Sequence, residues 1–197
     1  MSGGQPARPI PLFASLLVAG AVAIMITLGL WQLGRLREKE ALLAHYARAE
    51  ASPAEVRFPV GTPGQALLYR HSRLTCDKVL SASFVSGRNR AGDPGLARLV
   101  RCAVPGGEAN VVLGWSRAPV AADWVGGEVV GTIAPGGADG AKLVADPPLA
   151  GLAANMRPDP REIPNNHFSY AVQWFLFAAT ALVIYALALR ARWKKAE

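Results

Sequence analysis

Two long uncharged apolar stretches constrain this chain more than any other feature of its sequence. They run from Pro9 to Gly34 and from Ile163 to Leu189, and both are rich in Leu, Ala, Val and Ile. An α-helix rises about 1.5 Å per residue, so about 20 apolar residues cross a hydrocarbon core about 30 Å thick. Both stretches are long enough. We therefore predict two transmembrane helices that bracket a middle segment large enough to hold its own core.

The basic charge of the chain lies beside these two stretches. The formal net charge is +7, which alone would suggest a nucleic-acid partner. Four basic residues against Glu38 give residues 1–39 a charge of +3, and four against Glu197 give residues 163–197 another +3. Only +1 remains for the middle segment. We interpret the charge as membrane-flanking, and expect the lipid bilayer and no nucleic acid as a partner.

The basic residues at the C-terminus indicate the orientation. Two spans place both ends on one side of the membrane, and positive residues beside a span favour the cytoplasm. Four such residues follow the second span, from Arg190 to Lys195. The three that follow the first span outnumber Arg8 on its other side, but long domains translocate largely regardless of such charges. We predict two cytoplasmic termini and an external middle domain.

The first stretch could instead be a cleaved signal peptide, because "AVA" at Ala21–Ala23 resembles a cleavage site. The apolar run continues beyond it as "IMITLGLW", whereas a signal h-region is about 7–15 residues long and ends near its site. We therefore favour a membrane anchor. No amphipathic Arg/Ser-rich presequence precedes it, and Arg greatly outnumbers Lys. The expected location is a bacterial cell inner membrane with a periplasmic middle domain.

Short apolar runs between the spans, punctuated by Gly and Pro, predict strands. Two such runs are "ALLYRHSRLTC" and "KVLSASFVSG". The sequence "LARLVRCAV", then "PGGEA", then "NVVLGWS" predicts a hairpin with a five-residue turn. Weaker candidates are "EVVGTIAPGG" and "AKLVADPP". The expected fold class is a membrane protein in which two transmembrane α-helices flank an external, mainly antiparallel β (α+β) domain.

This reading divides the chain into six expected segments. They are a cytoplasmic N-terminus (1–9), the first transmembrane helix (10–34), a juxtamembrane helix (35–53), an external β-rich domain ending in a Pro-rich linker (54–162), the cap and second transmembrane helix (163–189) and a cytoplasmic basic tail (190–197). The juxtamembrane helix is expected because Leu and Tyr recur there at helical spacing before Pro53.

The middle segment offers little chemistry of its own. Cys76 and Cys102 could form a disulfide in an oxidising compartment, but the sequence does not place them together, and we favour two buried, unpaired cysteines. No G-x-S-x-G, H-E-x-x-H or phosphate-binding glycine loop occurs. "RNRAGD" could bind an anion, but we favour a solvated turn. We therefore expect a protein that is not an enzyme.

The membrane-boundary residues carry a stronger signal. Asn165 or Asn166 is a suitable helix N-cap, which places His167 in the first turn of the second span. A period of 3.6 residues places four side chains on one face of the second span. Because the two spans are antiparallel, the C-terminal end of the first span should lie at the same membrane interface. The residues are His167, Tyr170, Ala171 and Trp174 on the second span, and Trp31, Gln32 and Arg35 on the first.

This set suits haem, with histidine as axial ligand, aromatic rings against the macrocycle and arginine on a propionate. Aromatic residues also gather at membrane interfaces for reasons of solvation alone. An ionisable group near a span is a functional hypothesis by default. Both readings of His167, as a haem ligand and as an interfacial residue, stay open at this point.

The two boundary segments resemble a known family. "LGLWQLGRLREKEALL" and "NNHFSYAVQWF" look like the two signatures of the Surfeit-locus family, membrane proteins that assist assembly of haem–copper cytochrome c oxidase. The architecture is similar over nearly the whole chain, and a bacterial member is indicated. The middle segment is a looser match, because Leu113 and Gly114 precede Trp115 where Asn-Arg-Gly is usual.

The resemblance implies transient binding of haem a and its insertion into subunit I of cytochrome c oxidase, with subunit I and haem a synthase as partners. His167 matches the histidine proposed to ligate the haem iron. The other matching residues are Trp31, Gln32 and Arg35 in the first signature, and Tyr170 and Trp174 in the second. Two alternatives are a scaffold for the nascent oxidase subunit that binds no haem, and an unrelated envelope sensor or complex component.

Overall fold

The computed structural model describes residues 11–120, 123–136 and 140–194. The predicted N-terminus at 1–9 and the end of the predicted basic tail, 195–197, lie outside the described residues. The expected positions of the membrane boundaries along the chain stay predictions.

The chain separates into two compact units, which are described in turn. One comprises Met1–Ala41 with Pro164–Glu197, and the other is Leu42–Ile163. The predicted fold class is confirmed, since two long apolar helices, one near each end of the chain, flank a mixed-sheet domain.

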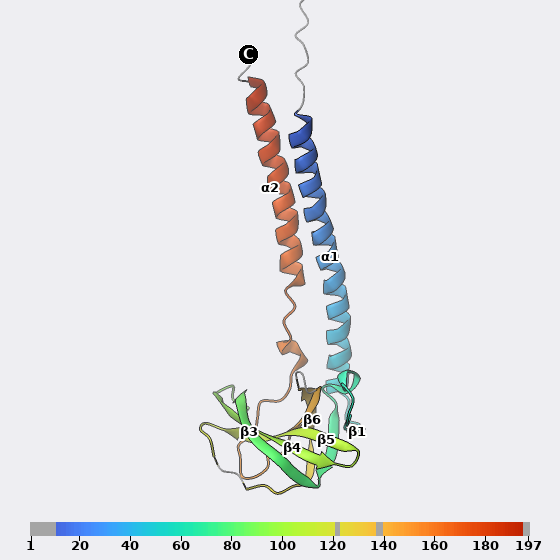
Figure 1. Ribbon diagram of the computed structural model, residues 1–197, viewed down its shortest axis with the longest axis vertical. Helices are drawn as coiled ribbons and strands as arrows, with labels where there is room; N and C mark the ends of the chain where they lie inside the picture. Colours follow the sequence, from blue (N-terminus) through green and yellow to red (C-terminus); the bar gives the residue numbers. More distant parts are fainter. Residues whose placement is uncertain (1–10, 121–122, 137–139, 195–197) are drawn as a thin grey trace, which may run out of the picture. The chain divides into compact units, whose positions relative to one another are not determined.

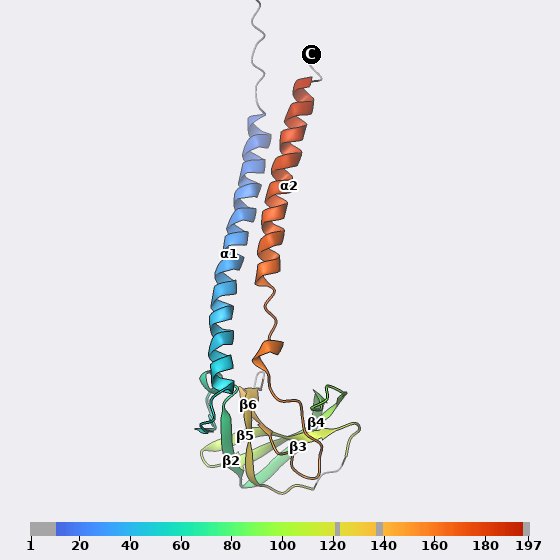
Figure 2. The same cartoon turned by 180° about the vertical axis from the view of Figure 1, so that it is seen from behind.

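The first unit consists of two paired helices. Helix α1 is Leu12–Glu50 and helix α2 is His167–Lys194. Within the described residues, these two are long and apolar enough to cross a membrane. They run antiparallel and side by side (Figures 1 and 2). Large apolar side chains such as Phe13, Leu17 and Leu182 are exposed on their outer surfaces, as expected for helices surrounded by lipid.

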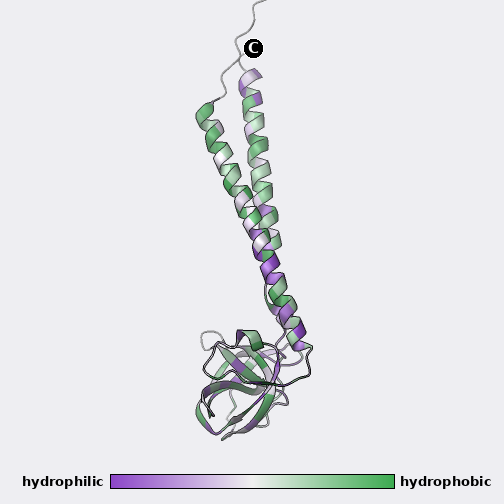
Figure 3. Cartoon of the chain, turned by 90° about the vertical axis from the view of Figure 1, so that its right-hand side faces the viewer, coloured by the Kyte–Doolittle hydropathy of each residue, from purple (hydrophilic) through white to green (hydrophobic). Residues whose placement is uncertain are grey.

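Helix α1 continues well beyond the apolar stretch. The predicted span and the predicted juxtamembrane helix form one element, because no proline interrupts the pattern before Pro53. Figure 3 shows hydrophilic residues gathering along the C-terminal part of α1, after a mostly hydrophobic N-terminal part. Arg35 and Glu38, three residues apart, form an exposed ion pair there, the spacing at which helical side chains meet.

The second unit is built on one mixed sheet. Its strands are β1 (Val56–Arg57), β2 (His71–Cys76), β3 (Lys78–Arg88), β4 (Pro94–Val104), β5 (Gly107–Ser116), β6 (Gly127–Pro135) and β7 (Ala141–Ala145). Among the described residues they form a seven-stranded sheet in the order β1-β2-β6-β7-β5-β4-β3. Most neighbours are antiparallel, as expected, but β1 with β2 and β5 with β7 are parallel. The 3-10 turns η1 (Gln65–Leu67) and η3 (Pro160–Glu162) lie outside the sheet.

The predicted hairpin is confirmed, but its turn is shorter than expected. Val104 of β4 pairs with Gly107 of β5, which leaves only Pro105 and Gly106 between the strands. Gly106 has φ 95°, and Pro followed by a residue with positive φ is the combination found in type II turns. The five-residue prediction was wrong because "EA" of "PGGEA" already pairs with β4.

The main core of this unit lies on one face of the curved sheet and includes the end of α1, while a smaller cluster of Ala97, Val112, Ala134 and Val144 lies on the other face. Fully buried residues include Val111, Ile133 and Leu143 from three different strands. Tyr46, near the C-terminal end of α1, joins the same core and packs on Tyr69 with ring centroids 5.0 Å apart. Burial raises the pKa of the Tyr69 hydroxyl, so this hydroxyl stays protonated at neutral pH.

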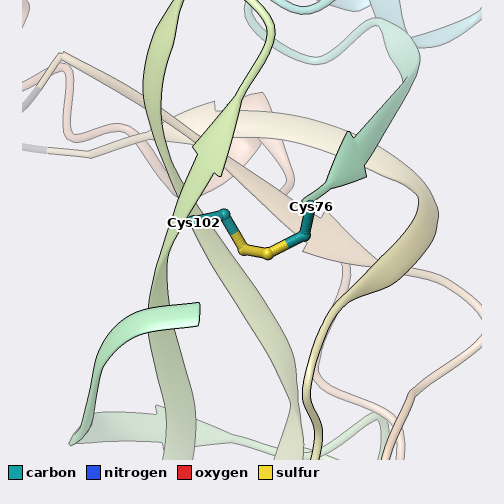
Figure 4. The surroundings of a disulfide bond; sticks show 2 residues. All are labelled: Cys76 and Cys102. Atoms are coloured by element: carbon teal, nitrogen blue, oxygen red, sulfur yellow. A yellow bond between two sulfur atoms is a disulfide. The ribbon is translucent and has the colours of Figure 1, made fainter. Parts of the chain in front are cut away.

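A disulfide joins Cys76, at the end of β2, to Cys102 in β4 (Figure 4). In a flat sheet these strands would stand four places apart, or about 19 Å at roughly 4.8 Å per strand. Their Cα atoms are 5.2 Å apart, so the sheet is strongly curved. Asp77 alone separates β2 from β3, at the opposite edge. The favoured reading of unpaired cysteines was wrong, because only this curvature brings the two thiols together.

Removing the disulfide should loosen this domain. Closing a loop with a sequence separation of 26 residues stabilises a fold by about 3 kcal/mol through the entropy of the unfolded chain. We expect the C76A/C102A variant to become protease-sensitive at lower urea than the wild type, measured in detergent across a urea titration. Reduced wild-type protein is the control and should show the same shift. Equal urea midpoints for all three samples would contradict the prediction.

Candidate functional site

The two helices of the first unit meet along a regular seam. On α1, buried or half-buried residues recur every three or four positions, at Ser15, Val18, Val22, Met25, Gly29 and Gln32. On α2 the same spacing occurs at His167, Ala171, Trp174, Ala178, Ala181 and Tyr185. A mean spacing of 3.5 residues is the period of coiled-coil packing. Since the helices are antiparallel, the first seam residue of one lies beside the last of the other.

Hydrogen bonds join the helices at both ends of this seam. The hydroxyls of Ser15 and Tyr185 lie 2.5 Å apart. At the other end, His167 Nδ1 lies 2.7 Å from Gln32 Oε1, with both side chains partly buried. A polar group without a partner costs several kcal/mol in hydrocarbon. These two contacts therefore fix the register of α1 against α2.

Small residues bring the helices close together between these two contacts. A Cβ atom added to Gly29 would lie only 2.6 Å from the Phe175 ring. Ala171 is 1% exposed and Ala178 is 4% exposed, so α2 also presents small side chains to the seam. Close approach of small residues is how helices pack in a bilayer, where no hydrophobic effect drives their association.

The start of α2 is as the sequence predicted. The backbone carbonyl of Asn166 accepts a hydrogen bond from the Tyr170 N–H, and His167 is the first residue of the helix. Asn166 therefore occupies the N-cap position. This cap places the imidazole at the extreme end of the seam.

The structure separates the six candidate residues into two groups. His167 and Gln32 are in direct contact, and Trp174 lies half-buried on the same seam two turns along α2. The other three, Trp31, Arg35 and Tyr170, point away from the seam and are exposed. Arg35 is ion-paired with Glu38. Whether any of these residues binds a cofactor stays a prediction.

The imidazole of His167 is engaged on one side only. A side-chain amide oxygen can only accept, so Nδ1 is the donor to Gln32 Oε1 and carries the proton. A neutral imidazole has one N–H, and Nε2 is therefore the nitrogen with a free lone pair. Within the described part of the chain, Nε2 makes no hydrogen bond. A half-buried histidine in this state fits the role of an axial haem ligand, which needs a single imidazole nitrogen.

Sequence reasoning missed four residues of this helix pair: Ser15 and Gly29 on α1, and Phe175 and Tyr185 on α2. On α1 no clear signal marked the seam, because Val18, Val22 and Met25 are as apolar as the lipid-facing residues between them.

The "RNRAGD" segment of the second unit forms a turn, as favoured from the sequence. The Asn89 side-chain oxygen accepts hydrogen bonds from the backbone N–H groups of Ala91 and Asp93, both at 2.9 Å. Such Asx geometry closes a turn without any ligand. Arg90 is ion-paired with Asp146. The helix pair is therefore the stronger candidate site.

Comparison with known protein families matches residues 19–179 to the family model described as the SURF1 family. This range covers most of the chain. It includes the whole second unit and the seam residues from Val22 to Gln32 on α1 and from His167 to Ala178 on α2. No curated protein matches the chain.

Enlarging Gly29 should disrupt the helix pair. We expect Gly29→Leu to collide with Phe175 and lower the SDS fraction at which the helices unfold in mixed micelles, with a cost of about 1–3 kcal/mol for overpacking. The midpoint can be followed by the helical circular dichroism signal. Gly20→Leu is the matched control, because a Cβ at Gly20 meets nothing within 4 Å. Equal midpoints for the two variants would show that α1 and α2 do not pack at Gly29.

Proposed function

The chain belongs to the SURF1 family, and on this premise we propose that it binds haem a transiently at the His167 end of its helix pair. Membership implies a membrane protein with a role in cytochrome c oxidase assembly, and members are assembly factors rather than enzymes. The proposed task is to assist insertion of haem a into subunit I of the oxidase.

The state of the His167 side chain is the observation that carries the proposal. Its Nδ1 is held by Gln32 at 2.7 Å, and its Nε2 is available to a metal. Bound haem would supply an iron, which His167 would hold through this nitrogen. Trp174, half-buried on the seam, and exposed Trp31 and Tyr170 would offer aromatic surface to the macrocycle.

The remaining candidate, Arg35, would hold a propionate. Its guanidinium is about half exposed and pairs with Glu38 on the surface of α1. An exposed pair of this kind contributes at most about 1 kcal/mol. Arg35 can therefore exchange the Glu38 carboxylate for a haem carboxylate at little cost, and arginine suits such planar, two-oxygen recognition.

The proposed location follows from the redox chemistry of the second unit. Disulfides form and persist in oxidising compartments such as the bacterial periplasm, and are rare in the cytosol. The Cys76–Cys102 bond thus supports an external domain with both termini cytoplasmic, in a bacterial inner membrane. On that side of the membrane, the helix pair would receive haem a from haem a synthase and deliver it to subunit I.

The absorption spectrum of the purified protein tests haem binding. Wild-type protein purified from cells that make haem a should show a haem band, and His167→Ala should lose it while accumulating to the same level. His71→Ala is the matched control, because His71 is exposed on β2 and should keep the band. A colourless wild type would remove the haem proposal and favour a scaffold for the nascent oxidase subunit.

Deletion of the gene tests the role in assembly. Cytochrome c oxidase activity of the membranes should fall, because subunit I would lack its haem a, and plasmid-borne wild type should restore it. Membrane insertion of unrelated proteins should be unaffected. Unchanged oxidase activity, in cells with no second gene of this family, would contradict the assembly role.

A further inference from the structure

We propose that Gln32 is a positioning residue for His167: its amide oxygen holds the imidazole in the one tautomer and orientation that present Nε2 as a ligand. The inference rests on the proposed function, because it assigns to Gln32 the readiness of His167 to bind haem iron. It deepens that function by explaining how His167 is oriented to bind the haem iron and why it can release haem a again.

The geometry of the contact carries the first step. Gln32 and His167 are 135 residues apart in the chain, yet Oε1 and Nδ1 lie 2.7 Å from each other. An unpartnered neutral imidazole populates both tautomers, and its ring turns freely about χ2. One hydrogen bond to Nδ1–H removes both freedoms, because it selects the tautomer and fixes the plane of the ring. Nε2 is left with its lone pair.

The seam explains why Gln32 can do this and its neighbours cannot. Gln32 lies one turn beyond Gly29, where α1 approaches Phe175 closely, and its side chain is partly buried toward α2. Trp31, the preceding residue, is 55% exposed and points away from the seam. A side chain on the seam keeps its place because both helices hold it, so the orientation of the imidazole depends on helix pairing.

The neutrality of the amide carries the second step. Partners of metal-bound histidines are often carboxylates, which raise the basicity of the imidazole and strengthen its bond to the metal. Gln32 offers the same acceptor without the charge, which would also be costly beside a membrane span. The result is an oriented imidazole whose hydrogen-bond partner carries no charge. Such a ligand holds haem less tightly than a carboxylate-backed histidine and therefore suits a carrier that must deliver it.

Matched variants of Gln32 test the proposal in full-length protein purified in detergent from cells that make haem a. Gln32→Met keeps the length of the side chain and removes the amide acceptor, and should weaken haem retention by about 10- to 100-fold, the usual effect of losing such a partner. Gln32→Glu keeps the acceptor and adds charge. It should retain haem at least as well as the wild type and lower the midpoint potential of the haem, because a more basic ligand favours ferric iron.

Gln173→Met is the control for a glutamine-to-methionine change in this helix pair, because Gln173 is exposed on α2. It should leave the haem content and spectrum as in the wild type. A Gln32→Met protein with wild-type haem content and spectrum would overturn the inference and leave the proposed function standing. Loss of haem in both Gln32→Met and Gln32→Glu would also overturn it, because a carboxylate accepts the same hydrogen bond.

The tautomer of His167 can be read without haem, which separates the two proposals. Nitrogen-15 NMR of histidine-labelled protein distinguishes the protonated from the bare ring nitrogen. The chain has 3 histidines, and His167→Ala assigns the signal. For the neutral imidazole, at alkaline pH, we expect Nδ1–H at His167 in wild type and Gln173→Met, and a mixture of the two tautomers in Gln32→Met.

This readout also guards against a variant that fails to fold. Wild-type protein with the proton on Nε2 of His167 would refute the role of Gln32 whatever the variants do. A colourless wild type with the expected tautomer would remove haem binding and leave the Gln32–His167 contact established. Both outcomes are decided on the wild type alone.

Discussion

Hydrocarbon offers polar groups no hydrogen-bond partner, and the arrangement of the helix pair depends on this constraint. The apolar faces of α1 and α2 gain no hydrophobic free energy by leaving lipid for each other, so they do not determine the register of the pair. The register is set by polar side chains that must find one another: Ser15 with Tyr185 at one end, and Gln32 with His167 at the other. Between them, Gly29 lets the backbones approach.

The contact between Gln32 and His167 satisfies a hydrogen-bonding group of each side chain and also orients the imidazole. Gln32 contacts Nδ1 of His167, and among the described residues Nε2 makes no hydrogen bond, so the contact that pairs the helices also leaves open the nitrogen that the proposed function needs. The proposed carrier function draws on both: a paired seam that holds the imidazole still, and a neutral partner that keeps it a moderate ligand. The second unit contributes differently, since its disulfide supports the proposed location of this unit in an oxidising compartment.

Local patterns predicted the elements well. The apolar length of each stretch predicted the helices, and the short runs between Gly and Pro predicted β2 to β7. An N-cap at Asn165 or Asn166 predicted that His167 lies in the first turn of α2. The patterns failed where two distant segments had to meet. The predicted turn around Pro105 and Gly106 was too long, because it included residues that pair with β4. The sequence also did not place Cys76 near Cys102, because the curvature of a sheet cannot be read from the sequence of either strand.

For the site, the sequence by itself placed His167 in the first turn of α2, and Trp31, Gln32 and Arg35 near the end of the first apolar stretch. Only the tertiary structure decided which of them face each other. The rotation of a helix about its axis is set by the packing of its whole seam against a partner, and here small and polar residues far from His167 turn Gln32 inward and Trp31 outward. The rotation of α1 therefore makes Gln32, and not Trp31 or Arg35, the hydrogen-bond partner of the His167 imidazole.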